Sequence, residues 1–397
     1  MKFLLVHNYY QQGGGEDRSF ESEVELLRSN GHDVITYTRH NDDVEDMNLL
    51  SVAMKTVWNQ STYRDVLKLI DREQPDLMHC TNTFPLISPS IYYAAKRRSV
   101  PVVQSLRNYR FLCVNASFYR QDQICERCIN SSMALPGVMH GCYRGSRAGS
   151  AVVAARNFAC RIMGTWKKKV DLYFAPTEFT RQKFITAGFD GDLIEVKPNF
   201  LAPDPGVGEG AGNYALFIGR LSPEKGLDTM IEAWEKVDSK LPLKIIGDGP
   251  QRELVQQAHQ KGLVDWLGRL PPDQVIPLIQ NATMLIMPSS WYETFGRVVM
   301  ESFACGTPVV VAGHGAMYQL VTEGVDGVSF TPKNADELFQ RVVNLVENPG
   351  KLQQMRVAAR QTYEKRFTKD TNYNLLMNIY QRAIQLANPP RELKTTT

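Results

Sequence analysis

The chain has 397 residues, of which 43% are hydrophobic and 22% are charged, as in ordinary globular proteins. This length exceeds one hydrophobic core, so we expect two domains of about 150–200 residues, and the net charge of +3 gives no reason to expect a nucleic-acid ligand. The N-terminal apolar run is too short for a signal peptide, and no stretch reaches the roughly 18 apolar residues of a membrane span, so we expect a cytoplasmic protein.

Strands and helices alternate through the first half of the chain. The apolar patterns predict strands at 3–7, 34–37, 77–80, 101–106, 172–175 and 193–196, and helices at 20–29, 63–73 and 90–98. A run of three glycines, 13–15, separates the first strand from the first helix. Residues 107–150 lose this alternation.

A linker rich in Pro and Gly at 203–212 divides the chain, and the alternation restarts after it. We expect strands at 215–218, 243–246, 284–287 and 308–311, and later helices at 335–346, 352–366 and 374–386. Two such halves predict an α/β fold with two doubly wound parallel sheets facing across a cleft, in domains 1–202 and 203–373. Ligands of such sheets bind outside the carboxyl ends of the strands.

Two cations follow the strand at 215–218. Arg220 and Lys225 would stabilise the growing negative charge of a nucleoside diphosphate leaving group, and the helix start after Gly226 would add a partial positive charge. The alternative is an Arg and a Lys solvated in a loop.

Two carboxylates follow the strand at 284–287. Glu293 precedes a predicted helix and Glu301 lies two turns into it, so a helical path between them spans about 12 Å. Glu293 would accept hydrogen bonds from sugar hydroxyls and Glu301 from a ribose, while Thr294, Phe295 and Gly296 would offer backbone N–H groups. The alternative is two surface carboxylates near a helix start. Together with the cations, this pattern favours a nucleotide-sugar ligand.

Two glycine-containing turns also follow strands. Gly14 and Gly15 would let backbone N–H groups approach a phosphate, although the pattern is not that of a dinucleotide-binding loop; the alternative is a flexible turn. Gly247 belongs to a turn that we expect to line the nucleotide pocket, mainly in a structural role.

The irregular segment 107–150 contains four cysteines: Cys113, Cys125, Cys128 and Cys142. One close pair with two single cysteines can form a tetrahedral thiolate site for a structural zinc ion, which a cytosolic setting favours over disulfides. Four unligated thiols are the alternative, and the spacing does not decide between the two.

A basic segment spans 147–170 and includes Arg156, Arg161 and Lys167–Lys169. Such a helix either lies on an anionic membrane surface, which would suit a lipid-linked acceptor, or is a domain helix with a solvated basic face. We favour the second, and a peripheral location at the inner membrane face stays open.

The motifs resemble those of the retaining glycosyltransferases of family 4, which have the GT-B fold. The resemblance covers nearly the whole chain and rests on residues 7–9, 13–16, 219–226, 247–250, 293–301 and 304–310. It implies metal-independent transfer of a hexose from a UDP-sugar or GDP-sugar to a hydroxyl of a saccharide or lipid-linked acceptor, in polysaccharide or glycolipid biosynthesis.

The resemblance also implies roles for individual residues. Arg220 and Lys225 would contact the diphosphate, Glu293 the donor sugar and Glu301 the ribose. Main-chain groups near Arg269 and Leu270 would meet the base. The N-terminal domain would bind the acceptor, and the last helix, about 374–390, would pack back onto it.

One position departs from the family pattern. Arg107 stands where many relatives have a histidine beside the donor sugar. Because arginine keeps its proton, Arg107 cannot be a general base, but it could bind an anionic group on donor or acceptor or stabilise phosphate. Retaining GT-B enzymes are thought to use the leaving phosphate as proton acceptor, so activity does not require the histidine. The alternatives are a GT-B-type epimerase or phosphorylase, which generally lack the carboxylate pair, and a non-catalytic nucleotide-sugar binding module.

Overall fold

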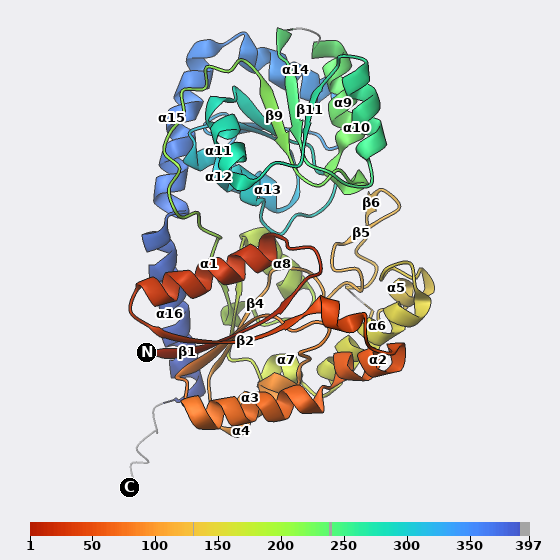
Figure 1. Cartoon of the computed structure of the whole chain (residues 1–397), viewed down its shortest axis with the longest axis vertical. Helices are drawn as coiled ribbons and strands as arrows, with labels where there is room; N and C mark the ends of the chain where they lie inside the picture. Colours follow the sequence, from red (N-terminus) through yellow and green to blue (C-terminus); the bar gives the residue numbers. More distant parts are fainter. Residues whose placement is uncertain (130, 238–239, 390–397) are drawn as a thin grey trace, which may run out of the picture.

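The computed structural model describes residues 1–129, 131–237 and 240–389, and it has two lobes (Figure 1). Each lobe is built on a six-stranded parallel sheet, with the strand orders β2-β1-β3-β4-β7-β8 and β11-β10-β9-β12-β13-β14. The central strands are buried at nearly every position because helices cover both faces of each sheet. The predicted fold class, two doubly wound parallel sheets, is confirmed.

The first lobe contains residues from the N-terminus to β8. Its sheet consists of β1 (Lys2–Tyr9), β2 (Asp33–His40), β3 (Leu77–Asn82), β4 (Val102–Ser105), β7 (Leu172–Ala175) and β8 (Ile194–Val196). Its helices are α1 (Gly15–Ser29), α2 (Leu49–Val57), α3 (Gln60–Glu73), α4 (Ser90–Arg97), α5 (Leu135–Met139), α6 (Arg147–Ile162), α7 (Thr165–Lys168) and α8 (Glu178–Thr186).

The second lobe follows the segment at 203–212, which contains no helix or strand. Its strands are β9 (Ala215–Ile218), β10 (Leu243–Ile246), β11 (Asp265–Gly268), β12 (Met284–Met287), β13 (Val309–Ala312) and β14 (Gly327–Phe330). Its helices are α9 (Leu227–Val237), α10 (Arg252–Gln260), α11 (Pro272–Asn281), α12 (Arg297–Ala304), α13 (Gly315–Leu320), α14 (Ala335–Val346) and α15 (Pro349–Arg366).

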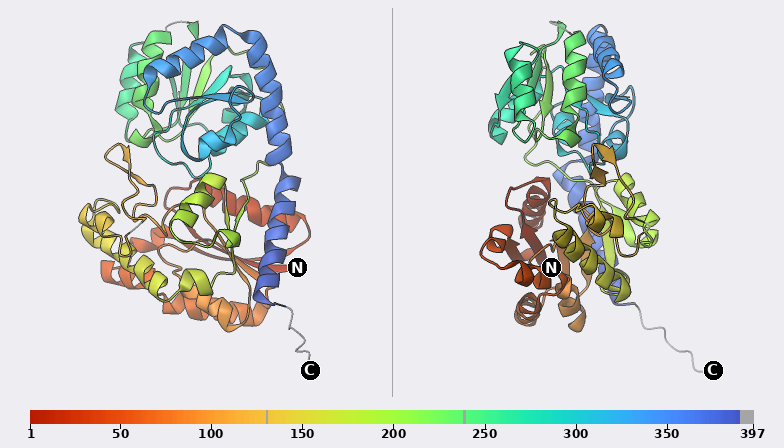
Figure 2. Two further views of the ribbon diagram at one scale, coloured as in Figure 1. Left: turned by 180° about the vertical axis from the view of Figure 1, so that it is seen from behind. Right: turned by 90° about the vertical axis from the view of Figure 1, so that its right-hand side faces the viewer.

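The last helix, α16 (Lys369–Ala387), returns to the first lobe and runs along its side (Figure 2). Its apolar face is buried against the first sheet, where Tyr380 packs on Phe3 with ring centroids 4.8 Å apart. The Tyr380 hydroxyl also lies 2.9 Å from Nδ1 of the buried His79. The helix therefore joins the two lobes on the side opposite the short hairpin at residues 119–124 (Figure 1).

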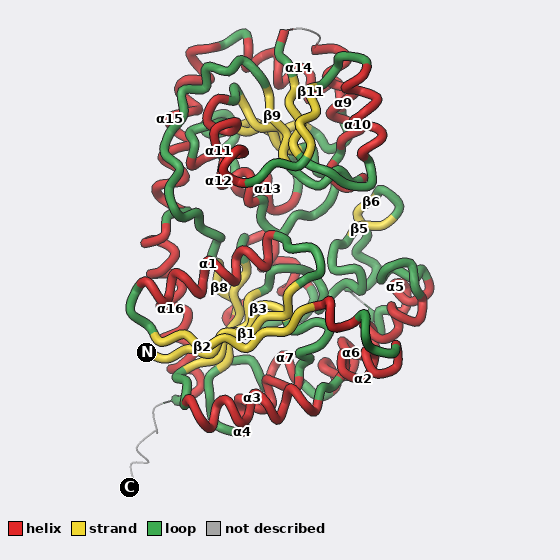
Figure 3. The backbone as a smooth tube through the Cα atoms, viewed as in Figure 1, coloured by secondary structure: helices red, strands yellow, loops and turns green. Residues whose placement is uncertain are grey.

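The irregular segment 107–150, which contains the four cysteines, includes a hairpin that reaches the second lobe (Figure 3). Its strands are β5 (Tyr119–Arg120) and β6 (Gln123–Ile124). The Tyr119 hydroxyl lies 3.0 Å from the Ser290 hydroxyl, and Lys333 donates a hydrogen bond to the Asp122 carbonyl. The two lobes thus touch through a second connection beside the loop that follows β12.

The elements that were not predicted include α2, α8, β11 and β14. The two strands are only four residues long and include Asp265, Gly268, Gly327 and Ser329, so they lack a clear apolar pattern. The predicted start of the first helix at residue 20 was wrong, because α1 begins at Gly15, where Asp17 accepts a hydrogen bond from the Gly14 N–H at 3.0 Å. Within the described part of the chain, no helix is long and apolar enough to cross a membrane.

Candidate active site

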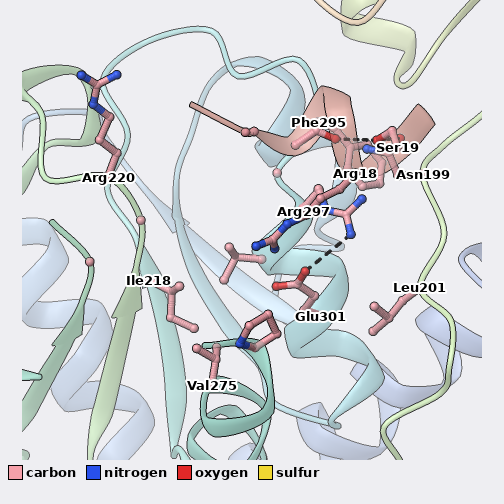
Figure 4. A pocket seen from close by; sticks show the side chains of 18 of the residues that line it. Arg18, Ser19, Asn199, Leu201, Ile218, Arg220, Val275, Phe295, Arg297 and Glu301 are labelled. Carbon is pink, nitrogen blue, oxygen red and sulfur yellow. Dashed lines mark hydrogen bonds and ion pairs between the residues drawn. The ribbon is translucent and has the colours of Figure 1, made fainter. Parts of the chain in front are cut away.

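A pocket of about 1,500 Å³ lies between the two lobes, at the carboxyl ends of strands from both sheets. Residues from both lobes line it, as Figure 4 shows for Arg18 and Asn199 on one side and Ile218 and Glu301 on the other. All the residues predicted to bind the donor or to act in catalysis line this one pocket: Gly14, Gly15, Arg107, Arg220, Lys225, Gly247, Arg269, Leu270, Glu293, Thr294, Phe295, Gly296 and Glu301.

Lys225 and Glu293 form an ion pair inside the pocket. The Ser289 hydroxyl donates to the same carboxylate at 3.2 Å, and the Lys225 ammonium lies 5.5 Å from the centre of the Trp291 ring. Both charged side chains are largely buried, with 16% and 13% exposed. A single ammonium can therefore face a bound anion while it holds the carboxylate that we expect to bind the sugar.

Gly226 allows the loops that carry these two residues to meet. Its φ is +72°, and a Cβ at this position would lie 2.1 Å from the Pro288 carbonyl oxygen, which is backbone and cannot move aside. The left-handed conformation alone disfavours a side chain. The loop after β9 and the loop after β12 are thus held together where the ion pair forms.

We expect Gly226→Ala to abolish donor binding and to destabilise the fold by more than the roughly 1–2 kcal/mol that left-handed strain alone costs. Gly262→Ala is the matched control, because Gly262 has φ +74° and nothing within 4 Å of the added Cβ. Chemical denaturation and nucleotide titration of both variants provide the measurement. Equal effects at the two positions would contradict the steric argument.

Arg220 lies on the wall opposite Glu301 and is exposed to the pocket (Figure 4). Among the described residues it forms no ion pair, in contrast to Lys225. Its guanidinium is therefore available to a ligand anion without a competing carboxylate.

Glu301 lies one turn into α12 rather than two, so the predicted placement was wrong by a turn. The helix starts at Arg297 because Gly296 adopts φ +102° and ends the preceding loop there. Burial raises the pKa of the Glu301 carboxyl, while Arg297, whose Nη2 lies 3.9 Å from Oε1, and Arg18 lower it less strongly.

This pKa shift predicts how donor binding depends on pH. Protonation turns one oxygen of Glu301 from an acceptor into an O–H donor and removes its negative charge. We therefore expect affinity for the donor nucleotide to fall as the pH drops through a pKa above that of an ordinary glutamate. Titration of the nucleotide at several pH values measures the effect. Glu301→Gln should bind more weakly and should lose this pH dependence; an unchanged pH profile in that variant would contradict the assignment.

Two arginines of the pocket were missed by sequence reasoning. Arg18 on α1 and Arg297 on α12 approach Glu301 from opposite lobes (Figure 4). The aliphatic part of the Arg297 side chain lies close to the run of glycines at 13–15, because a Cβ added at Gly15 would lie 3.2 Å from the Arg297 Cδ. Arg297 and Glu301 are four residues apart on one helix, and this spacing could have indicated that the two side chains lie side by side.

A buried network of charged and polar side chains holds Arg107 in place. Its Nη2 lies 2.6 Å from Glu23, its Nη1 donates to Asn199, and Lys197 Nζ lies 2.6 Å from the same Glu23 oxygen. Burial would raise the pKa of Glu23, but Arg107 and Lys197 outweigh it and lower this pKa to about 2. Most of the Arg107 guanidinium is therefore engaged with the protein.

The four predicted zinc ligands lie near one another without forming a coordination site. Burial raises the pKa of Cys128 to about 11, and Cys113, Cys142 and Cys125 add to this shift. Yet within residues 1–129, 131–237 and 240–389 no group of three or more His, Cys, Asp or Glu side chains is placed to hold a metal ion. The described geometry does not fit a zinc site, and elemental analysis of the purified protein would distinguish bound zinc from free thiols.

Two family models match the chain along most of its length. The glycosyl transferase 4-like domain matches residues 14–199, and the model described as glycosyl transferases group 1 matches residues 207–362. The chain belongs to this glycosyltransferase family.

Individual relatives match the chain at low identity. A glycogen synthase of Mycobacterium tuberculosis is 31% identical over 172 residues, which are 42% of this chain and 41% of that protein. An uncharacterized 42.6 kDa protein in the cps region of Klebsiella pneumoniae is 24% identical over 87% of this chain and 96% of its own. The chain spans less than half the length of several curated relatives, for example 40% of an uncharacterized glycosyltransferase of Methanocaldococcus jannaschii.

Solved structures share the fold of this chain. HepE of Anabaena in complex with UDP-glucose has a TM-score of 0.68 at 20% identity, covering 96% of this chain and 99% of that one. A sucrose-phosphate synthase of Thermosynechococcus elongatus has a TM-score of 0.70 at 14% identity, covering 96% and 98%.

Proposed function

We propose that this protein is a retaining glycosyltransferase that moves a hexose from a nucleoside diphosphate sugar to a hydroxyl of a saccharide or lipid-linked acceptor. The observation that carries the proposal is the interlobe pocket, where two cations and two carboxylates from the ends of β9 and β12 line one space. A ligand with a diphosphate between a sugar and a ribose matches that arrangement.

Each group of the pocket has a role in this reaction. As the glycosidic bond breaks, charge grows on the diphosphate, and Arg220 and Lys225 stabilise it where the surrounding protein limits screening by water. Glu293 binds hydroxyls of the transferred sugar, and Glu301 binds the ribose. The leaving phosphate accepts the proton of the attacking hydroxyl, so the reaction uses no metal ion and no histidine at position 107.

The donor is a UDP-sugar or a GDP-sugar in this proposal. UDP is supported by the shared fold of HepE, which has been solved with UDP and with UDP-glucose. Main-chain groups of Arg269 and Leu270, which also line the pocket, lie where the base would bind. Arg107 faces the donor from the first lobe, and Arg107→His combined with a panel of donors measures its influence on donor preference.

A screen of thermal unfolding against nucleotides and nucleotide-sugars tests the proposal first, because a ligand that binds only the folded state raises its melting temperature. The stabilising donor is then incubated with candidate acceptors, and glycoside, sugar phosphate and free sugar are separated. Glycoside is the expected product. Sugar phosphate would indicate a phosphorylase, an isomerised nucleotide-sugar an epimerase, and tight binding without turnover a binding module.

We also propose that the first lobe docks on an anionic membrane through the surface formed by α2, α5 and α6, the last of which contacts both others. Large apolar side chains are exposed there, including Leu49 (87%), Leu50 (70%), Met139 (68%) and Ile162 (69%). Arg161, Lys167 and Lys168 are exposed nearby, whereas Arg156 is only 1% exposed, so its prediction as part of a basic surface was wrong.

Flotation with vesicles measures this docking. We expect binding to vesicles that contain anionic lipid at low salt, weaker binding at high salt because the charges are screened, and at least a fivefold loss for the pair Leu49→Gln and Leu50→Gln. Val357→Gln is the control, because Val357 is 52% exposed on α15 of the other lobe. Wild-type protein that does not float at low salt would refute the docking.

A further inference from the structure

A second, much smaller cavity lies in the first lobe beside the donor pocket. It has a volume of about 20 Å³ and sits at the carboxyl ends of β3 and β4, beneath the chain that follows β4. Arg107 lines both this cavity and the donor pocket, so the two spaces adjoin. Its size admits about one water molecule or one to two oxygen atoms of a ligand.

Three arginines surround this space, and we call it the arginine cavity after Arg107, Arg110 and Arg156. None of the residues that line it is an Asp or a Glu. Arg107 has Glu23 as its partner, but Arg110 and Arg156 form no ion pair with any described residue. The cavity therefore has an excess of positive charge.

Arg156 is the most unusual of the three because it is only 1% exposed. Its polar partners are neutral: Thr83 Oγ1 at 3.3 Å and Asn157 Oδ1 at 3.1 Å. The rings of Phe111 and Trp166 lie 5.5 and 5.6 Å from its guanidinium carbon, which offsets part of the lost hydration but accepts no in-plane hydrogen bond. A buried charge without a counter-charge is strongly unfavourable, so such a residue usually has an anion as partner.

Several hydrogen-bonding atoms at the cavity also lack partners. The Nε atoms of Arg107, Arg110 and Arg156 and the Thr81 hydroxyl are buried without a hydrogen bond. Native proteins satisfy nearly all buried polar groups with protein partners or ordered water, so four unsatisfied atoms on residues around one small space indicate a position for a water molecule or a ligand oxygen. Three of them are cationic N–H donors, which bind carboxylate and phosphate oxygens most strongly.

We propose that the arginine cavity is the acceptor anion subsite and takes the oxygens of a carboxylate or phosphoryl group carried by the acceptor. This assignment rests on the proposed function, because it places the acceptor on the first lobe next to the donor. The cavity is too small for a sugar ring, so only the acidic group enters it while the reacting hydroxyl stays in the interlobe pocket. The acceptor class is thus an acidic or phosphorylated saccharide.

The test uses the full-length protein with inorganic phosphate as the first probe, followed by glucose 1-phosphate and glucuronate, with glucose as the neutral control. Phosphate is also attracted to Arg220 and Lys225, so the titrations are repeated in the variant that carries Arg220→Met and Lys225→Met. The informative substitution is Arg156→Met. Its matched control is Arg161→Met, which removes an exposed arginine from the same helix.

We expect phosphate and both acidic sugars to bind wild type, the Arg161→Met control and the variant with Arg220→Met and Lys225→Met. Arg156→Met should bind them at least tenfold more weakly, and glucose should not bind through this cavity in any protein. Binding of the donor nucleotide should be the same in wild type and Arg156→Met. Should Arg156→Met fail to fold, Thr81→Val takes its place and is expected to weaken binding of the acidic sugars by several fold.

Three outcomes would overturn this proposal: equal affinity of Arg156→Met (or of Thr81→Val in its place) and wild type for the acidic probes, no binding of these probes to wild type, or binding of inorganic phosphate but not of the acidic sugars. The last outcome would mean that the cavity holds a free ion rather than an acceptor group. Failure of wild type to bind any nucleoside diphosphate would instead refute the proposed function, and it would be seen separately in the donor titration.

Discussion

Replacing Glu23 with glutamine should lower the free energy of unfolding by about 3–5 kcal/mol, the usual effect of removing one member of a buried ion pair. Glu23 is 1% exposed and is the carboxylate that faces both Arg107 and Lys197. Glutamine would leave two buried cations without an anion. Burial already lowers the pKa of Lys197 to about 8, and Glu23 offsets only part of that shift.

Denaturation by urea measures the effect, with Glu25→Gln as the control because Glu25 is exposed on the same helix. The pH dependence has a definite sign. Since the pKa of Glu23 is lowered from 4.5 to about 2, its stabilisation is fully present above pH 4.5 and is lost as the pH falls from there toward 2. A difference below 1 kcal/mol at pH 7 would show that the network does not stabilise the first lobe.

Lys225→Met should lower kcat by about 10²–10³-fold, the effect of removing one group that stabilises charge in a transition state. The substitution keeps most of the side-chain length and leaves Arg220 as the remaining cation that we expect to bind the diphosphate from that loop. It also frees the Glu293 carboxylate, which now repels the phosphates, so KM for the donor should rise as well.

Initial rates at saturating donor measure this effect, after thermal unfolding has shown that the variant is folded. Lys236→Met is the matched control, because Lys236 lies on the outer surface of the same lobe, where it pairs with Asp336. A kcat within threefold of wild type for Lys225→Met would show that the ammonium does not act on the leaving group.

The fold could be predicted from the sequence because most of its strands are short apolar runs that alternate with helices. Both sheets are parallel and covered on both faces, so strands such as Val309–Ala312 are apolar at every position. The edge strands β11 and β14 were not predicted because they contain glycine and polar residues. The start of α1 was not predicted because it depends on the Asp17 cap.

Part of the site was predictable for a similar reason. Parallel strands bring their carboxyl ends to one edge, so residues that follow different strands, such as Lys225 and Glu293, meet there. The environment of Arg107 was not predictable in this way. Its partners Glu23 and Asn199 lie 84 and 92 residues away on other elements, and no local pattern encodes such contacts.

Arg156 illustrates a second limit of sequence patterns. The basic residues near it in the sequence suggested that Arg156 lies on a basic helix face. In the structure, its side chain is buried in the interior, near Arg110. A single charged residue on the buried side of a helix does not change the overall periodicity. Only the three-dimensional arrangement shows that it lacks a carboxylate partner.

Above all, we propose that Arg220 and Lys225 bind the diphosphate of a nucleotide in the interlobe pocket. Calorimetric titrations of the protein with UDP and uridine, and with GDP and guanosine, test this by comparing the affinity for each diphosphate with that for its nucleoside. We expect one diphosphate to bind at least tenfold more tightly than its nucleoside, and we expect this difference to disappear in the variant with Arg220→Met and Lys225→Met. Equal binding of diphosphate and nucleoside by the wild type, or an unchanged difference in the variant, would contradict it.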